Sequence, residues 1–254
     1  MKIVRFFFVG LVFLFLANCS TASENQTSVV LNFKHSWHQQ LITANELGQI
    51  QYYNAHGETL SVERLRYLIS NIQLLRDDGT SYSVNPNYFL IDLSQEATLS
   101  IALGEDFPVG DYAQLDFVFG FLDEDNIDGV YADLNSANWN VPAALGGGYH
   151  YLQLDGKFQI GEDSPQNYNY HMIRAADRSD PNNLQLQETA FQVQLGDFEV
   201  GENASLTVEM QVHEWFENPY TWDLTQWNTM LMPNFAAQLK MKQNGASVFR
   251  WPSP

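Results

Sequence analysis

The chain has 254 residues and one cysteine, Cys19, so no disulfide bond can form within it. Basic residues are also few: 12 lysines and arginines stand against 30 aspartates and glutamates, and the formal net charge is −18 at pH 7. A surface with this excess of negative charge repels nucleic acid and anionic lipid. The composition therefore predicts that the protein has no nucleic-acid partner.

Motifs of several common functional sites are missing from the sequence. It has no HExxH pair, no GxSxG elbow, no glycine-rich phosphate loop and no CxxC pair, which argues against hydrolase, nucleotide-binding and zinc-ribbon proteins. The acidic run Asp123–Gly129 misses the EF-hand pattern, because Ile127 stands where the fifth ligand should be. We expect a solvated turn there rather than a calcium site.

The apolar run near the N-terminus is too short to cross a membrane. It has 12 residues, from Phe6 to Ala17, whereas a spanning helix needs roughly 20. With Lys2 and Arg5 before it, this run predicts an export signal peptide over residues 1–18. The adjoining Leu-Ala-Asn-Cys resembles a lipobox, with Cys19 as the lipidated residue, although Asn18 replaces the usual Gly or Ala. The alternative is cleavage after Ala22, which gives a soluble secreted protein.

The rest of the chain is predicted to form a lipidated tether and one domain. Ser, Thr, Asn and Glu dominate residues 19–28, which favours a flexible tether. Residues 29–254 contain no linker-like segment, and their length suits one large β domain. Loss of residues 1–18 removes two basic residues and no acidic one, so the formal charge moves from −18 to −20.

Alternating apolar and polar residues dominate this domain and predict an all-β fold. Each alternating run is bounded by Gly, Pro, Asn or Asp, and such regular spacing favours a single antiparallel β-sandwich with long loops. Helical periodicity is scarce; we expect one or two short helices, at Val62–Leu68 and Leu224–Met230. The predicted strands are Val29–His35, Leu68–Arg76, Tyr88–Asp92, Ala97–Leu103, Gln114–Phe121, Tyr149–Ile160, Phe191–Leu195 and Ser205–His213.

Two predicted strands carry a histidine on the face expected to point into the core. His150 shares its face with Leu152 and Leu154, and His35 shares its face with Leu31 and Phe33. A buried imidazole needs a hydrogen-bond partner or a metal ion. Imidazole suits copper, zinc, iron and nickel, and without a thiolate a copper site must use nitrogen, methionine sulfur or oxygen. The two histidines therefore predict a metal pocket, although each could instead be a hydrogen-bonded core residue.

Aromatic residues gather in one later segment and allow a different interpretation. The segment surrounds Asn218-Pro219, and its rings either pack in the core and at its rim or form a platform on which a sugar stacks. The aromatic residues are Trp215, Phe216, Tyr220, Trp222 and Trp227.

Several blocks of the sequence occur in a familiar order. The most specific are LRYLISNIQL at 65–74 and GYHYLQLDG at 148–156; the others are FKH at 33–35, YNAHGE at 53–58, YNYH at 168–171 and HEWFENPYTWDL at 213–224. From about Val29 to Phe249 this order resembles the MbnP-like family of bacterial periplasmic and outer-membrane proteins. The resemblance implies a β-sandwich that binds copper and acts with a di-haem cytochrome c peroxidase-like (MbnH-like) partner, which can oxidise a tryptophan of the copper protein to kynurenine.

Carried over by position, the resemblance also implies site residues. His35, His150 and His171 match positions where the family often has histidine, so they are the expected copper ligands. His213 stands where many relatives have asparagine and is a further candidate. Trp139 matches a family tryptophan and is the candidate for oxidative modification.

We therefore expect a copper-binding lipoprotein of the bacterial cell envelope, in the periplasm and anchored to the outer membrane, that acquires, stores or delivers copper and is not an enzyme. One alternative is a carbohydrate-binding surface lipoprotein with structural histidines. Another is a copper-dependent oxidoreductase, which needs an open coordination position and a substrate cleft.

Overall fold

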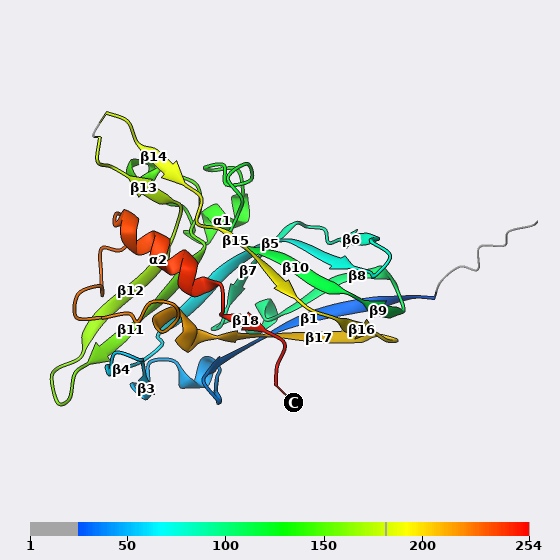
Figure 1. The fold of residues 1–254 in the computed structure, drawn as a ribbon, viewed down its shortest axis with the longest axis horizontal. Helices are drawn as coiled ribbons and strands as arrows, with labels where there is room; N and C mark the ends of the chain where they lie inside the picture. The colour runs from blue at the N-terminus through cyan, green and yellow to red at the C-terminus, as the bar shows by residue number, and fades with distance from the viewer. Residues whose placement is uncertain (1–24, 181, 254) are drawn as a thin grey trace, which may run out of the picture.

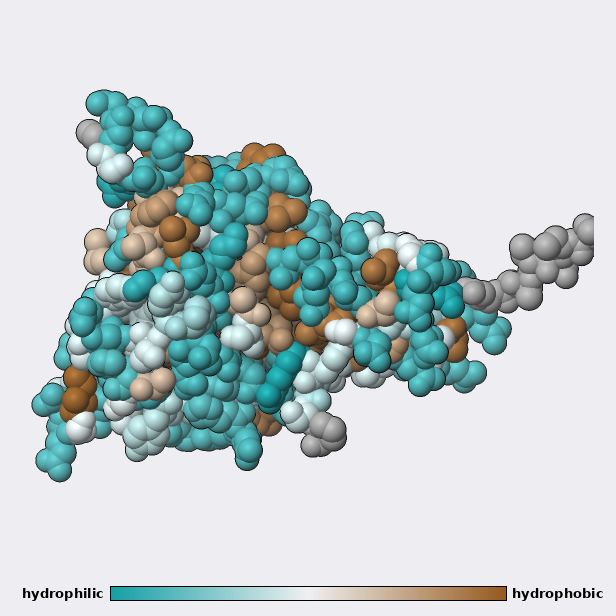
Figure 2. Space-filling view, viewed as in Figure 1, coloured by the Kyte–Doolittle hydropathy of each residue, from teal (hydrophilic) through white to brown (hydrophobic). Residues whose placement is uncertain are grey.

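The computed structural model describes residues 25–180 and 182–253. Cys19 and the predicted signal peptide lie outside these residues. Within them the fold is mostly β-strand, arranged as a β-sandwich, so the all-β prediction is confirmed (Figure 1). No helix in this part of the chain is both long and apolar enough to cross a membrane. Hydrophilic residues cover most of the face shown in Figure 2, and hydrophobic residues occur on it in scattered groups.

The first sheet has five strands in the order β18-β17-β1-β2, and β8 also pairs with β1. β1 and β17 run parallel, with Val29 opposite Ala204, which is one exception to the antiparallel prediction. A parallel pair needs a long crossover connection, and nearly the whole domain lies between these two strands. The strands are β1 (Gln26–Trp37), β2 (Gln40–Ile42), β8 (Ser100–Pro108), β17 (Ala204–Gln211) and β18 (Phe249–Arg250).

The second sheet has nine strands in the order β15-β10-β5-β11-β4-β3, with β12 paired to β11, and β6 and β7 paired to β5. All of its pairings are antiparallel. Its strands are β3 (Tyr52–Tyr53), β4 (Thr59–Leu60), β5 (Arg64–Leu75), β6 (Ser81–Ser83), β7 (Tyr88–Asp92), β10 (Gln114–Phe119), β11 (Leu152–Gln159), β12 (Gln166–Met172) and β15 (Phe191–Leu195).

The remaining elements are two small two-stranded sheets and a few helices. The small sheets pair β13 (Ala175–Asp177) with β14 (Gln185–Gln187), and β9 (Gly110–Tyr112) with β16 (Phe198–Val200). The helices are η1 (Ala44–Glu46), η2 (Glu96–Thr98), α1 (Ala132–Ser136), η3 (Ala143–Leu145), η4 (Val212–Phe216) and α2 (Phe235–Gly245).

Both predicted helix positions are wrong. Most of Val62–Leu68 belongs to β5, because its apolar residues lie in a strand that is buried along most of its length. Residues 224–229 form turns and bends. The carboxylate of Asp223, the expected N-cap, accepts hydrogen bonds from the N–H and hydroxyl of Thr225, so its side chain finds partners in a turn instead of at the start of a helix.

Aromatic rings connect the two sheets. Phe33 of β1 contacts Tyr67 of β5 and Phe117 of β10, with ring centroids 6.1 and 6.4 Å apart. Phe249 of β18 contacts the same Phe117 at 5.1 Å and in an edge-on arrangement. Such edge-to-face pairs contribute about 0.5–1.5 kcal/mol beyond the burial of their area. The core of the sandwich is therefore aromatic, and the histidine His35 lies inside it.

The first strand follows the predicted alternation but begins earlier than predicted. Leu31, Phe33 and His35 are all buried. The strand starts at Gln26, so the predicted tether of residues 19–28 ends too late. Thr27 pairs with Phe107 of β8 and is itself buried. This pairing places residues in the sheet that their polar composition had assigned to the tether.

Gly156 in β11 is a position where even one methyl group meets backbone. A Cβ there would collide with the carbonyl oxygen of Ser61 and with the ring of Tyr168, whose hydroxyl donates to that carbonyl. We expect Gly156→Ala to lower the free energy of unfolding by about 3 kcal/mol, the upper end for an overpacked core. The matched control is Gly196→Ala, where nothing lies within 4 Å. Urea denaturation measures both, and equal midpoints would contradict the expectation.

Candidate metal centre

His150 lies just before β11, between two buried tyrosines, and both of its ring nitrogens have defined neighbours. Its Nδ1 is 2.9 Å from the backbone carbonyl oxygen of Trp139. A carbonyl can only accept, so Nδ1 carries the proton and Nε2 carries the lone pair. That Nε2 lies 3.2 Å from the Sδ atom of Met232. A nitrogen lone pair therefore faces a thioether sulfur.

The His150 ring is neutral near pH 7. Burial lowers its pKa from 6.5 to about 4, with the nearby charges of His171 and Arg66 acting in the same direction. A neutral imidazole cannot donate a hydrogen bond from Nε2 once Nδ1 holds the proton. Two electron-pair donors, nitrogen and sulfur, are thus held together, which is the arrangement that a soft metal ion needs.

Met232 is held in place by the helix that follows it. Gln238 of α2 is fully buried, and its Nε2 donates to the carbonyl oxygens of His171 and Leu231 at 2.9 and 3.0 Å. Its Oε1 accepts from the N–H of Ile173 at 2.8 Å. One side chain therefore ties the end of β12 to the loop that carries Met232.

His171 lies within β12, opposite Gln153 of β11, and its ring is 5.5 Å from that of His150. Its Nε2 is 2.7 Å from Oδ1 of Asp155, which leaves Nδ1 as the nitrogen able to ligate. A carboxylate behind a histidine fixes the ring and raises its basicity as a ligand.

Asp155 orients His171 through the hydrogen bond to its Nε2. Burial opposes its ionisation, but the hydrogen bond and charge of His171, the Asn169 amide and Arg64 together hold the pKa of its carboxyl below the usual value. The Nε of Arg64 lies 2.9 Å from Oδ2 of the same carboxylate. Asp155 is therefore a charged acceptor at neutral pH.

An open groove of about 610 Å³ adjoins these residues and is lined largely by apolar side chains. His171 and Met232 both line it. Met230, two residues before Met232, also lines it and is 77% exposed. This exposure places a second thioether at the mouth of the groove. The groove gives an ion or a partner access to Met232 and His171.

Trp139 lies directly against this centre. Its ring is 5.6 Å from that of His150, and the Arg66 guanidinium lies 5.1 Å from its centroid. It is completely buried, and its Nε1 has no hydrogen-bond partner among the described residues. A buried donor without a partner is uncommon and costly. The indole therefore stands beside the donors with an unsatisfied polar group.

His35 lies elsewhere in the core. Its Nε2 is 3.0 Å from the hydroxyl of Tyr67, and complete burial lowers its pKa from 6.5 to about 4. Among the described residues, the groups of three or more His, Cys, Asp or Glu with ligand atoms within 4.8 Å include none of His35, His150 and His171. The tyrosine hydroxyl supplies the polar partner that a buried imidazole requires.

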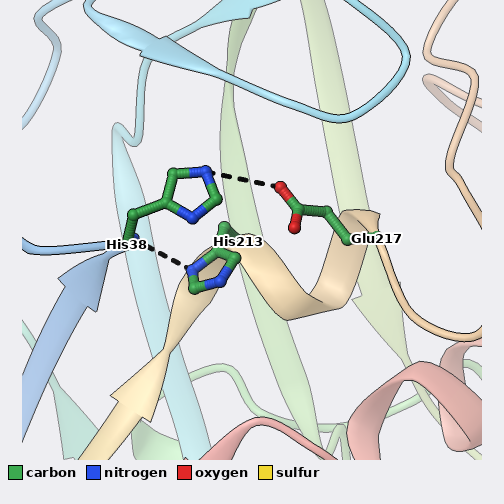
Figure 3. Close-up of side chains that lie close together, drawn as sticks. All are labelled: His38, His213 and Glu217. Carbon is green, nitrogen blue, oxygen red and sulfur yellow. Dashed lines mark hydrogen bonds and ion pairs between the residues drawn. The ribbon is translucent and has the colours of Figure 1, made fainter.

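His213 belongs to a separate group with His38 and Glu217, drawn in Figure 3. Its Nδ1 accepts a hydrogen bond of 3.0 Å from the backbone N–H of His38. Burial of His213, followed by the charge of His38, lowers the pKa of His213 from 6.5 to about 4.

A second group consists of His56, Glu58 and Asp223, and the Nδ1 atom of His56 is 2.8 Å from Oε1 of Glu58.

The aromatic segment after His213 is mainly core. Trp215, Phe216 and Trp222 are completely buried. The two more accessible rings, Tyr220 and Trp227, are covered by the Lys240 ammonium, at 5.0 and 3.9 Å from their centroids. This arrangement leaves no flat pair of exposed rings among these five residues, so it favours packing over a sugar platform.

The predicted acidic turn also has a structural role. Asn126 in Asp123–Gly129 is buried, donates to the Tyr151 hydroxyl and accepts from the N–H of Tyr149, at 2.9 and 2.8 Å. The segment therefore anchors the residues on either side of His150.

Sequence reasoning did not single out Met232, Gln238 or Glu217. Met232 was detectable in part: Met230 and Met232 lie two residues apart before a proline in a chain with six methionines. Gln238 was not, because nothing in a sequence distinguishes a buried glutamine from an exposed one on a helix.

The fold and this centre define a class: all-β sandwich proteins that hold a histidine and a methionine together beside an open groove. The model of the MbnP family matches residues 26–233, which is most of the chain, and the chain belongs to the MbnP family. The structure is similar to that of MbnP from Methylosinus trichosporium, with a TM-score of 0.51, 12% sequence identity, and coverage of 78% of this chain and 80% of that one. At this identity the match shows a shared fold. No curated protein matches the chain by sequence.

Proposed function

We propose that this protein binds a copper ion at His150, Met232 and His171 and acts in copper acquisition, storage or delivery. The observation that carries the proposal is the pair formed by His150 Nε2 and Met232 Sδ, 3.2 Å apart, in which two electron-pair donors face each other. Imidazole and thioether are ligands that suit copper in a chain without an available thiolate. The donor set therefore fits the metal that the family implies.

Each of the three residues would bind copper through a different atom. His150 donates through Nε2 because the Trp139 carbonyl holds the proton on Nδ1. His171 donates through Nδ1 because Asp155 occupies its Nε2. Met232 supplies the sulfur, and Gln238 ties the loop that carries it to the end of the strand that carries His171. Copper bound by these residues would be the cargo of the protein, a redox-active and thiophilic ion held beside the groove.

The exposed thioether of Met230 suits transfer of the ion. Methionine is a soft, flexible ligand, and this one stands in solvent at the mouth of the same groove as Met232. We propose that copper passes between Met230 and the inner donors as it enters or leaves. This role favours acquisition or delivery over catalysis.

The cellular setting is a proposal from the sequence. The N-terminal run and Cys19 support an envelope lipoprotein anchored to the outer membrane. The resemblance supports a di-haem MbnH-like partner, with Trp139 as the residue that the partner oxidises. The position of Trp139 next to His150 supports this choice, because modification there would alter the surroundings of the metal.

Anaerobic titration of Cu(I) against a competing chelator tests the proposed function. We expect the purified protein to take up one copper ion per chain at this site with an affinity that Met232→Leu lowers at least tenfold. Leucine has a similar volume and no sulfur, so the fold is retained. A wild-type protein that leaves all of the copper with a weak chelator would contradict the proposal.

A further inference from the structure

His38, His213 and Glu217 come together from two parts of the chain. His38 lies in the two-residue turn between β1 and β2, whereas His213 lies in η4 and Glu217 directly follows η4. One ligand atom of each lies within 4.8 Å of the others. Figure 3 shows His38 and Glu217 directed toward each other above the His213 ring. The group shares no residue with the proposed copper site.

The His213 ring presents a lone pair toward His38. Its Nδ1 accepts the backbone N–H of His38 at 3.0 Å, so Nδ1 carries the lone pair and the proton of the neutral ring is on Nε2. Oε1 of Glu214 lies 3.4 Å from that Nε2. A carboxylate near the far nitrogen is a common neighbour of a metal-binding histidine.

His38 is placed over that ring by an unusual backbone conformation. Its φ is +52°, a region that residues other than glycine seldom adopt and that Asn tolerates better than most. The two imidazole rings have centroids 3.9 Å apart. The Nε2 atom of His38 lies 3.5 Å from Oε1 of Glu217. The turn thus holds an imidazole against a second imidazole and a carboxylate.

The side of the group away from the core is open. A groove of about 550 Å³ runs beside it, lined by His38, His213 and polar residues that include Gln211. The side chain of Glu217 is 17% exposed and that of His38 is 56% exposed. An ion can therefore reach the three donors from solvent, with space for a water molecule as a further ligand.

We propose that His38, His213 and Glu217 form a second metal site, selective for a divalent ion such as Zn²⁺. Two imidazole nitrogens and one carboxylate oxygen form a donor set used by zinc, which completes its coordination with water. The set contains no sulfur, unlike the histidine–methionine centre. The ion takes the position at His213 Nδ1 that the backbone N–H of His38 occupies in its absence.

Calorimetric titration of the full-length, copper-free protein with Zn²⁺ tests this site. The variants are His38→Asn, which suits the positive φ, and Glu217→Gln, which keeps the shape of the side chain; both change accessible residues and spare the core. We expect each to lower zinc affinity at least tenfold. Two controls, His56→Asn in the other histidine–carboxylate group and Met232→Leu in the copper site, are expected to retain the wild-type affinity.

A second readout locates the ion. In ¹⁵N spectra of the imidazole rings, Zn²⁺ is expected to shift the Nδ1 resonance of His213 and leave that of His35 unchanged. Wild-type affinity in His38→Asn or Glu217→Gln, or loss of zinc binding in His56→Asn alone, would overturn the proposal. Failure of the wild type to bind zinc would overturn it as well, without bearing on copper at His150.

Discussion

Replacing His150 by alanine is expected to lower the affinity for Cu(I) at least about 100-fold. Loss of residues that merely orient metal ligands already costs about 10–100-fold, and here a ligand itself is removed. His150 supplies the lone pair that faces Met232 at 3.2 Å, and its neutral state persists to about pH 4, so protons do not compete for Nε2 at pH 7. Competition with a chromophoric Cu(I) chelator measures the change.

The control for this prediction is His56→Ala. The His56 side chain is 42% exposed and is bonded to Glu58, so its removal is expected to leave copper affinity unchanged. Circular dichroism and a urea midpoint verify that the His150→Ala protein is folded. Equal copper affinities for folded His150→Ala and His56→Ala would show that His150 is a structural histidine.

Acidification is expected to destabilise the metal-free protein between pH 6.5 and 4, and His35 contributes to the loss together with His150 and His213, whose pKa values are lowered in the same way. The pKa of His35 falls from 6.5 in the unfolded chain to about 4 in the fold, because complete burial disfavours the charged ring. Above pH 6.5 the ring is neutral in both states and contributes no pH dependence. Between 6.5 and 4 the unfolded state binds the proton more readily, so stability falls as the pH falls.

The size of this contribution is about 3 kcal/mol for His35, taken over the whole window. Urea denaturation at several pH values measures it, and His35→Gln, which keeps a polar partner for Tyr67, should remove that part of the slope. The control is His56→Gln, since the hydrogen bond that His56 donates to Glu58 raises the pKa of His56 and gives its contribution the opposite sign. An unchanged acid slope in His35→Gln would contradict the burial argument.

The fold was predictable where a strand has one buried face. β1 alternates as its sequence indicates, and this alternation placed His35 in the core. β5 and β11 are buried on both faces over most of their length, and a continuous apolar run does not distinguish strand from helix. That ambiguity produced the wrong helix at Val62–Leu68. The real helix α2 has few apolar residues in a helical stripe, and its N-cap, Asn234, is its clearest sequence marker.

The candidate site was predictable only in part, because it depends on contacts between distant segments. His150 and His171 followed from the resemblance, and antiparallel pairing of β11 with β12 brings their rings together. Met232 is 82 residues from His150 in sequence and reaches it through the contacts of Gln238. No local pattern encodes such a contact. The metal role predicted for His35 and His213 stays a prediction. His35 contacts the Tyr67 hydroxyl, and His213 lies with His38 and Glu217.

X-ray absorption at the copper edge of the Cu(I)-loaded protein tests the central claim most directly. A site at His150, Met232 and His171 predicts imidazole nitrogen scatterers together with one sulfur scatterer, and the sulfur contribution should disappear in Met232→Leu while the imidazole contribution remains. A wild-type spectrum without sulfur, or one that Met232→Leu leaves unchanged, would contradict the account.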